Sequence, residues 1–250
     1  ELMEERDAAN KVKQEAPILV ILGNPPYNAF AGISPTEEGG LVDAYKEGLT
    51  TPLKQGGWGI KKFKLDDLYV RFFRIAERRI AKSGKGVVCY ISNYSWTSEQ
   101  SFVVLRKHML QSFDKLWIEN MHGNRKISEY APDGRTSETV FAIPGFSPGI
   151  QQGVVISLWV RRDGHEEEDG PLAKVLYRDD IDAARAVERR RQLLASLRLK
   201  ILDRKYKVAK PGPANRFSFR PATIERHYLK WLRVVDLCEV PPSNGLMEKR

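Results

Sequence analysis

The chain has 250 residues, of which 42% are apolar and 29% are charged, so its composition fits a folded domain and excludes a disordered chain. No apolar run reaches about 18 residues and the N-terminus carries no apolar signal region, which excludes a transmembrane helix and predicts a cytoplasmic protein. Two isolated cysteines, Cys89 and Cys238, form neither a disulfide framework nor a metal-ligand pattern, and no metal site is expected.

The net charge of +9 is unevenly distributed. The segment from Arg185 to Arg233 contains 15 Lys and Arg residues and only three acids, so the remainder of the chain is slightly acidic. A basic segment joined to a nearly neutral domain indicates a polyanionic partner. The alternative is a solvated helix face without a partner.

The chain begins with a polar stretch, residues 3–15, that predicts a helix ended by Pro17. Ile18–Leu22 is a short, unbroken apolar run, which predicts a strand buried on both faces of a parallel sheet. Pro25 and Pro26 offer no N–H and cannot extend the strand, so it must stop at Gly23. A stiff loop then follows at the carboxyl end of the strand, where open α/β sheets bind ligands.

The loop Asn24-Pro25-Pro26-Tyr27 can bind an exocyclic amino group. The Asn24 amide oxygen and the Pro25 carbonyl are two acceptors, and the second is held rigidly between proline rings. Together they can accept both hydrogens of an NH₂ group and expose its lone pair, while Tyr27 stacks on the ring that bears the amine. The alternative is an ordinary Pro-rich turn.

The next elements alternate between helix and strand. Residues 28–60 are rich in Gly and predict a long loop over the active site. Residues 66–83 predict an amphipathic helix with Leu65, Leu68, Tyr69, Phe72, Ile75, Ala76 and Ile80 on its buried stripe. A strand at 86–91 that makes Cys89 a buried thiol, a helix at 98–111 and a strand at 115–120 follow. This order predicts a doubly wound α/β fold.

The last third of the chain is less regular. Residues 123–137 predict a polar loop, and residues 153–160 predict a strand that forms the antiparallel partner of a terminal hairpin. The acidic run 163–169, which includes His165, predicts a solvated turn. Residues 181–201 predict a strongly basic helix, and Pro211-Gly212-Pro213 predicts a boundary before a new unit.

The tetrapeptide Asn24-Pro25-Pro26-Tyr27 resembles the catalytic motif of the N6-adenine and N4-cytosine DNA methyltransferases. Those enzymes use S-adenosylmethionine and flip the target base out of the duplex. The same tetrapeptide occurs in protein-glutamine methyltransferases and in some ribosomal RNA methyltransferases. By itself, the motif therefore indicates methyl transfer to a planar nitrogen and leaves the acceptor open.

The resemblance also implies roles for two further groups of residues. Asp67-Leu68-Tyr69 matches a family segment that helps to wall the S-adenosylmethionine site, although Asp67 also fits a helix N-terminal acid and its two neighbours fit core packing. The family stacks an aromatic side chain on the flipped base from a loop before the hairpin strand. Phe146 matches that position, with Phe141 as the rival, and a core phenylalanine is the alternative for either.

Residues 122–125 and 151–154 resemble the long single-chain restriction–modification enzymes of the Type ISP and Type IIG-like groups. The resemblance covers roughly residues 15–165. It implies the carboxyl-side half of a doubly wound, Rossmann-like methyltransferase sheet with a terminal β-hairpin over 1–162. A basic helical connector would span 163–210, and a target recognition domain would begin over 211–250. In such enzymes nuclease and helicase domains precede the methyltransferase.

One family feature is missing, because no strand followed by Gly-x-Gly precedes the catalytic loop to bind S-adenosylmethionine. This absence predicts an N-terminally truncated fragment that is inactive alone. The leading interpretation is a restriction–modification DNA methyltransferase that acts on adenine N6 of double-stranded DNA. The alternatives are a protein-glutamine or ribosomal RNA methyltransferase, or a catalytically incomplete DNA-binding fragment.

Overall fold

The computed structural model describes residues 2–27, 36, 39–63, 65–143, 151–166, 170–222, 227 and 230–232. The helices in this part of the chain are α1 (Leu2–Glu15), α3 (Leu68–Ser83), α4 (Val103–Ser112) and α5 (Ala186–Ser196). The strands are β1 (Val20–Gly23), β2 (Gly86–Asn93), β3 (Lys115–Asn120), β4 (Val154–Arg161), β5 (Lys174–Arg178) and β6 (Lys207–Val208).

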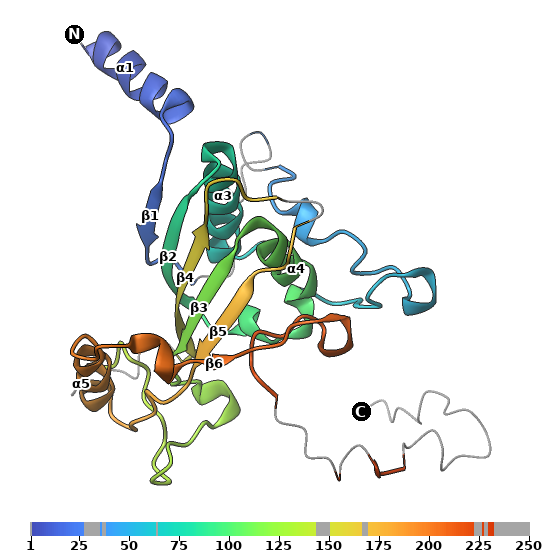
Figure 1. Cartoon of the computed structure of the whole chain (residues 1–250), viewed down its shortest axis with the longest axis vertical. Coiled ribbons are helices and arrows are strands. Elements are labelled where there is room, and N and C mark those ends of the chain that lie inside the picture. Colours follow the sequence, from blue (N-terminus) through green and yellow to red (C-terminus); the bar gives the residue numbers. More distant parts are fainter. Residues whose placement is uncertain are drawn as a thin grey trace, which may run out of the picture.

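All six strands belong to one sheet, in the order β1-β2-β4-β3-β5-β6 (Figure 1). β1 is parallel to β2 and β3 is parallel to β5, while β4 lies antiparallel between β2 and β3. This arrangement confirms the α/β fold and the antiparallel strand of the terminal hairpin. The carboxyl ends of β1, β2 and β3 meet at one edge of the sheet, which we call the carboxyl edge.

β1 is an edge strand, so the prediction of a strand buried on both faces is wrong for the described part of the chain. Its backbone pairs with β2, and Gly23 lies opposite Tyr90. Val20 is 59% exposed and Leu22 is 72% exposed. The apolar run has the composition of a covered strand, but no described element covers these side chains.

The buried stripe of α3 differs from the predicted one. Tyr69, Ala76 and Ile80 are buried as expected, but Phe72 and Ile75 are more than 40% exposed. Their place in the core is taken by their neighbours Val70, Phe73 and Glu77. The stripe is rotated because a buried polar network, which the apolar pattern does not reveal, turns Glu77 inward.

This polar network is centred on the Glu77 carboxylate, between α3 and α4. Tyr45 donates to its Oε2 at 2.5 Å, Arg74 donates to the same oxygen at 2.8 Å, and Ser112 donates to Oε1 at 2.8 Å. His108 lies 3.5 Å from Oε1. Burial acts to raise the pKa of Glu77, but the hydrogen bonds from His108, Tyr45 and Arg74 outweigh it and hold the pKa at about 2.

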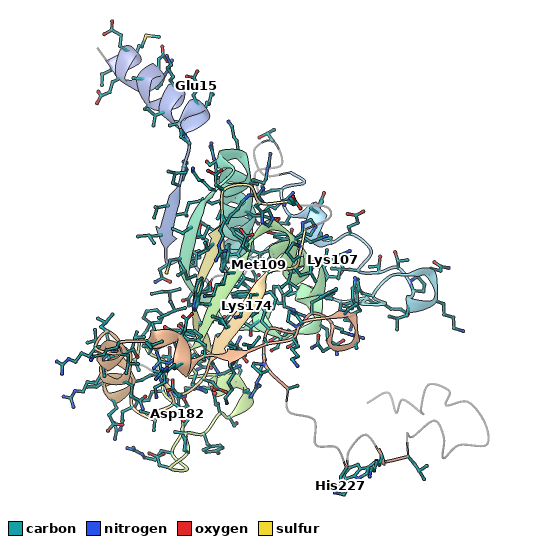
Figure 2. All side chains as sticks on the ribbon, in the orientation of Figure 1. Glu15, Lys107, Met109, Lys174, Asp182 and His227 are labelled. Carbon is teal, nitrogen blue, oxygen red and sulfur yellow. The ribbon has the colours of Figure 1, made fainter. Side chains whose placement is uncertain are left out.

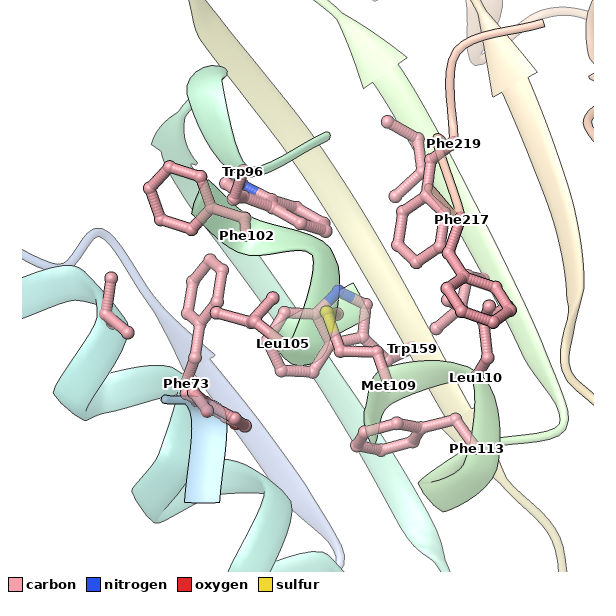
Figure 3. Packing of buried hydrophobic residues seen from close by; sticks show 14 of the residues in the cluster. Phe73, Trp96, Phe102, Leu105, Met109, Leu110, Phe113, Trp159, Phe217 and Phe219 are labelled. Carbon is pink, nitrogen blue, oxygen red and sulfur yellow. The ribbon is translucent and has the colours of Figure 1, made fainter. Parts of the chain in front are cut away.

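The core between the sheet and these two helices is built from aromatic rings (Figure 3). Phe73 contacts Trp159, Trp96 and Tyr90 with ring centroids 4.9 to 5.7 Å apart, mostly edge to face. The indole N–H of Trp96 donates to Ser92 and that of Trp159 donates to Ser157, both at 3.0 Å. Each tryptophan therefore has a partner for its polar atom, which makes its full burial possible.

The predicted loop over residues 28–60 contributes to this core in its described part. Val42, Tyr45 and Leu49 are buried, and a short 3-10 helix spans Asp43–Tyr45. The helix predicted over residues 98–111 begins later than expected, because a 3-10 turn occupies Gln100–Phe102 before α4.

Cys89 was expected to be a buried thiol, but it is only half-buried.

The basic segment is less helical than predicted, since α5 covers only Ala186–Ser196. Residues 181–185 are not helical, and the Ala184 carbonyl, within a bend at residues 184–185, accepts from the Glu138 N–H of the polar loop at 2.9 Å. After Ser196 the chain continues in a turn at residues 197–198. The sequence did not predict β5 and β6, which extend the sheet beyond β3. The short strand β5 lacks the alternation of buried and exposed residues that predicts a strand, because its last four residues are all buried.

The acidic turn also departs from expectation at His165. Its ring is buried, with Nδ1 at 3.0 Å from Asp114 and Nε2 at 2.7 Å from the Gln111 carbonyl. This histidine therefore ties the turn to the end of α4. Residues 167–169 lie outside the described part of the chain.

Side chains fill the space between the sheet and the helices α3 and α4, whereas α1 stands away from the sheet (Figure 2). Two contacts near its end tie α1 to α3: Lys82 donates to the Gln14 carbonyl at 2.6 Å, and Ser83 accepts from the Ile18 N–H at 2.9 Å. Within the described residues, no helix has the length and apolar character needed to cross a membrane. The same residues contain no cluster of potential metal ligands.

Candidate active site

The motif Asn24–Tyr27 lies at the carboxyl edge, directly after β1. Asn24 and Pro26 are exposed, whereas Pro25 is buried. A Cβ at Gly23 would lie 3.0 Å from the Tyr90 ring, so glycine allows the strand to approach this ring before it turns. The buried proline anchors the loop and leaves the Asn24 amide on the surface, as a binding role requires.

Tyr27 is half-buried in a second apolar cluster, on the sheet face opposite α3 and α4. This cluster consists of Met121, Val140, Val154 and Ile181, with Ile91, Ile156 and Leu193 beside it. The Tyr27 hydroxyl is buried, and no described group lies within hydrogen-bond distance of it. Burial raises the pKa of this phenol well above its ordinary value.

Phe141 is the aromatic residue that the structure brings to Tyr27. The two ring centroids are 6.5 Å apart and the rings are inclined by 54°. Phe141 is 36% exposed, so one side of its ring remains open. Phe146, the other sequence candidate, lies outside the described residues.

A pocket of about 740 Å³ opens at the same edge. Asp67 and Tyr69 at the start of α3 contribute to its wall, but Leu68 does not. Tyr69 is also a core residue, because its ring contacts Phe73 and Phe102. The rest of the wall comes from loops: Lys61, Lys62, Phe63, Asn93, Ser95, Glu99, Ser101, Phe102, Asn124, Lys126, Ile127 and Gln152.

The side chains of this pocket fit part of S-adenosylmethionine, which carries an ammonium group, a carboxylate and ribose hydroxyls. Asp67 and Glu99 offer carboxylates, and Lys61, Lys62 and Lys126 offer cations. Asn93 is bonded to Gln152, and the Asn93 Oδ1 accepts from the Ser95 N–H at 2.8 Å. The buried Oδ1 of Asn124 has no hydrogen-bond partner among the described residues.

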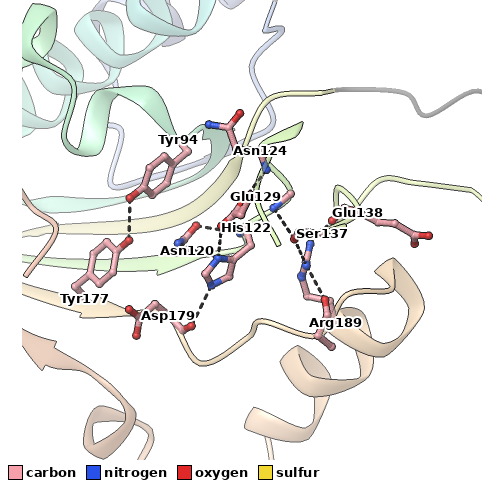
Figure 4. Close-up of polar contacts among 12 residues, drawn as sticks. Tyr94, Asn120, His122, Asn124, Glu129, Ser137, Glu138, Tyr177, Asp179 and Arg189 are labelled. Carbon is pink, nitrogen blue, oxygen red and sulfur yellow. Dashed lines mark hydrogen bonds and ion pairs between the residues drawn. The ribbon is translucent and has the colours of Figure 1, made fainter. Parts of the chain in front are cut away.

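The turn after β3 contains a polar cluster whose hydrogen bonds the sequence does not predict (Figure 4). The His122 backbone is left-handed, with φ of 54°, and its N–H donates to Asn120 Oδ1 at 2.9 Å. Its ring nitrogens lie 2.6 Å from Glu129 Oε1 and 3.0 Å from the Asp179 carbonyl. Both partners are oxygen atoms, so the imidazole ring is held between a side-chain carboxylate and a backbone carbonyl.

Glu129 holds this turn from the other side. Its Oε2 accepts from the Asn124 N–H at 2.7 Å. Burial acts to raise the pKa of Glu129, but the bonds from His122 and Asn124 outweigh it and the pKa lies below its ordinary value. Glu129 therefore links the His122 ring to Asn124, which lines the pocket. The only sequence signal was a histidine and a glutamate in the same polar loop.

Some basic residues of the segment from Arg185 to Arg233 make contacts that stabilise the fold. Arg189 of α5 is fully buried and donates to the Ser137 hydroxyl, the Ala183 carbonyl and the Glu138 carbonyl. Lys205 and Lys207 lie near Asp180 and Asp179. The exposed cations of this segment include Arg191, Arg198, Lys200, Arg204 and Lys210. The segment thus combines an internal clamp with a basic surface.

Comparison with known families decides the relationship of the chain. A family model described as Eco57I restriction-modification methylase matches residues 1–127, which include β1, the motif, α3 and β3. The chain belongs to this family. The expected resemblance to restriction–modification methylases is thereby confirmed.

Solved structures with the same fold include restriction–modification enzymes. The DrdV–DNA complex is 26% identical with a TM-score of 0.64 and matches 85% of this chain. A nuclease-deletion mutant of the Type ISP enzyme LlaGI, bound to a DNA substrate mimic, is 24% identical with a TM-score of 0.64 and matches 91%. The ATP-dependent Type ISP enzyme LlaBIII bound to DNA is 20% identical with a TM-score of 0.60 and matches 85%.

The Eco57I-family chain corresponds to only part of these structures. It covers 19% of the DrdV chain, 20% of the LlaGI chain and 13% of the LlaBIII chain. The two likenesses below 25% identity establish the fold alone. No curated protein matches the chain.

Proposed function

We propose that this Eco57I-family chain carries the target-base side of a DNA methyltransferase that acts on adenine N6 in a restriction–modification system. The observation that carries the proposal is the position of Asn24–Tyr27 at the carboxyl edge, with Asn24 exposed, Pro25 buried and Phe141 beside Tyr27. A rigid loop with an exposed amide acceptor at Asn24 next to two aromatic rings fits a planar ring with an exocyclic amine.

In the proposed reaction the Asn24 amide oxygen and the Pro25 carbonyl accept the two N6 hydrogens. Tyr27 stacks on the base, Pro26 keeps the loop rigid, and Phe141 or Phe146 covers the opposite face. S-adenosylmethionine, when bound, supplies an electrophilic methyl group on a sulfonium. By holding the two N6 hydrogens, Asn24 and Pro25 would leave the N6 lone pair free to accept that methyl group, and solvent water would take up the released N6 proton.

The cofactor would contact the 740 Å³ pocket through Asp67 and Tyr69, with Leu68 supporting the start of α3 from behind. The lining carboxylates and lysines support this assignment. A first cofactor-binding segment of the strand–Gly-x-Gly type does not occur in this sequence. These residues would therefore form one wall of the cofactor site.

Double-stranded DNA is the proposed partner. The exposed cations of α5 and the turns after it support a phosphate-binding surface next to the carboxyl edge. Under this proposal residues 163–210 connect the methyltransferase region to a target recognition domain that begins within 211–250. Phe217 and Phe219 are buried in the methyltransferase core, so the connection is packed firmly against it. Nuclease and helicase domains would precede the methyltransferase.

The Asn24→Ala variant of the full-length protein tests the proposal. Loss of one acceptor should reduce methylation of duplex DNA by at least about 100-fold, because this acceptor acts on the reacting nitrogen. DNA affinity should change by less than about threefold. Asn10→Ala, on the exposed face of α1, is the matched control. An equal loss of affinity and methylation would contradict the assigned role.

The same assay separates the alternatives. Parallel reactions with duplex DNA, ribosomal RNA and protein substrates should give methylated adenine in DNA only. Methylated glutamine or RNA would favour the other enzymes that share the motif. DNA binding without methyl transfer in the full-length protein would favour a catalytically incomplete binding protein.

A further inference from the structure

The segment Lys207–Arg220, which we call the C-terminal strap, runs from the far side of the sheet to the carboxyl edge (Figure 1). At its start, Lys207–Val208 pairs with β5, and the Ala209 N–H donates to the Val175 carbonyl at 3.0 Å. At its end, the Phe219 N–H donates to the Thr97 carbonyl at 2.9 Å. The strap therefore joins the last strand to the loop that follows β2.

Two buried rings hold the end of the strap. Phe219 meets Trp96 edge to face at 5.8 Å, and Phe217 meets Trp58 at 5.9 Å. Arg216 and Phe217 both have left-handed backbones, with φ of 53° and 54°. Such conformations persist in residues other than glycine only where the surroundings determine them.

Arg106 of α4 determines them here. Its guanidinium is fully buried and donates to four backbone carbonyls: Phe217 at 3.0 Å and Arg216, Trp96 and Glu99 at 2.8 Å each. Two of these carbonyls belong to the strap and two belong to the loop after β2. One side chain thus holds both segments at once.

The same loop forms part of the pocket wall. Ser95, Glu99, Ser101 and Phe102 line the 740 Å³ pocket, while the carbonyls of Trp96 and Glu99 point to Arg106. The pocket and the strap therefore contact one loop from different sides. A shift of the strap would move the wall of the pocket.

We propose that Arg106 is a positioning residue that locks the strap and the pocket-lining loop into one unit. The lock fixes the end of the strap, at Arg216 and Phe217, relative to the pocket. Since the proposed function places target recognition in residues 211–250, this inference rests on the proposed function for its effect on DNA. The lock itself does not depend on it.

Arginine suits this role because its planar guanidinium presents five N–H donors in a fixed arrangement. Lysine keeps the charge but offers three donors on one nitrogen, so it cannot reach four carbonyls in two segments. Arg161 is a matched control at the opposite edge of the sheet. It is 7% exposed and donates to the Gly84 and Ser112 carbonyls at 3.2 and 2.9 Å.

Hydrogen exchange of the full-length protein tests the lock without reference to DNA. In Arg106→Lys the Phe219 amide should exchange about tenfold faster or more, together with amides of residues 94–102. In Arg161→Lys the same amides should stay within about twofold of the wild type. Unchanged exchange at Phe219 in Arg106→Lys would overturn the inference. If Arg106→Lys does not fold, Phe219→Leu replaces it, since it removes the ring contact with Trp96.

Methylation kinetics test the consequence. At saturating DNA, Arg106→Lys should lower kcat about tenfold or more, because a small displacement in a site is costly. The Kd for DNA should stay within about threefold, and Arg161→Lys should leave both values unchanged. Faster exchange with unchanged kcat would overturn the positioning role. A wild-type protein that does not methylate DNA would refute the proposed function, and the exchange result would still decide whether the lock exists.

Discussion

The Tyr27 ring is proposed to stack on the target base, whereas the Tyr27 hydroxyl has no hydrogen-bond partner among the described residues. Since a buried, unsatisfied hydroxyl costs about 1–3 kcal/mol, Tyr27→Phe should leave the free energy of unfolding unchanged or raise it by up to about 1 kcal/mol. Stacking on the base should survive, so methylation should remain close to wild type. Urea unfolding and a methylation assay check both points, and a clear loss of stability would mean that the hydroxyl has an essential partner.

The lowered pKa of Glu77 predicts how the free energy of unfolding changes at acid pH. Its pKa of about 2 in the folded protein lies below the ordinary value of 4.5, so the folded state binds this proton more weakly than the unfolded state does. The resulting stabilisation, about 3 kcal/mol, is present above about pH 5 and is lost as the pH falls towards 2. Glu77→Gln should lower stability at pH 7 and flatten the decline between pH 5 and 2. Glu5→Gln, at an exposed position of α1, should leave the profile unchanged, and an unchanged profile in Glu77→Gln would refute this account.

At the scale of elements, α3 offers a matched pair of neighbouring phenylalanines. Phe73 is fully buried among four aromatic rings, whereas Phe72 is 41% exposed. Phe73→Ala should reduce the free energy of unfolding by about 3–5 kcal/mol, and Phe72→Ala should change it by less than about 1 kcal/mol. Thermal or urea unfolding measures both. Equal losses of unfolding free energy in the two variants would show that Phe72 contributes to the core, as the sequence pattern predicts.

These elements also show what the sequence can predict. The strands predicted at Ile18–Leu22 and Lys115–Asn120 correspond to β1, which spans Val20–Gly23, and to β3. Both could be predicted because unbroken or alternating apolar runs are local signals. The rotated stripe of α3 does not follow from the local pattern, because Glu77 is buried by partners that include Tyr45 and two residues of α4. The motif at residues 24–27 was found because it is contiguous. The His122–Glu129 pair and the contact of Phe141 with Tyr27 depend on the path of the chain between β3 and β4, which no local pattern specifies.

At the scale of the whole molecule, the question is whether these 250 residues bind the methyl donor. The described pocket supplies one wall, and the sequence lacks a strand–Gly-x-Gly segment. Titration calorimetry of this chain with S-adenosylmethionine should therefore give no measurable binding. Binding at micromolar Kd would show that the pocket alone suffices and that Asp67 and Tyr69 belong to a complete site, which Asp67→Ala should then weaken.

The antiparallel position of β4 has a consequence for the order of folding. β2 and β3 are consecutive in the chain but are not neighbours in the sheet, because β4 lies between them. During synthesis, β2 and β3 each keep an unpaired edge until the ribosome has released β4. β4 also carries Trp159, whose ring completes the aromatic cluster around Phe73. Pairing of such distant segments slows folding and lengthens exposure of unpaired strands. Truncation before residue 161 should therefore yield aggregates rather than a smaller domain.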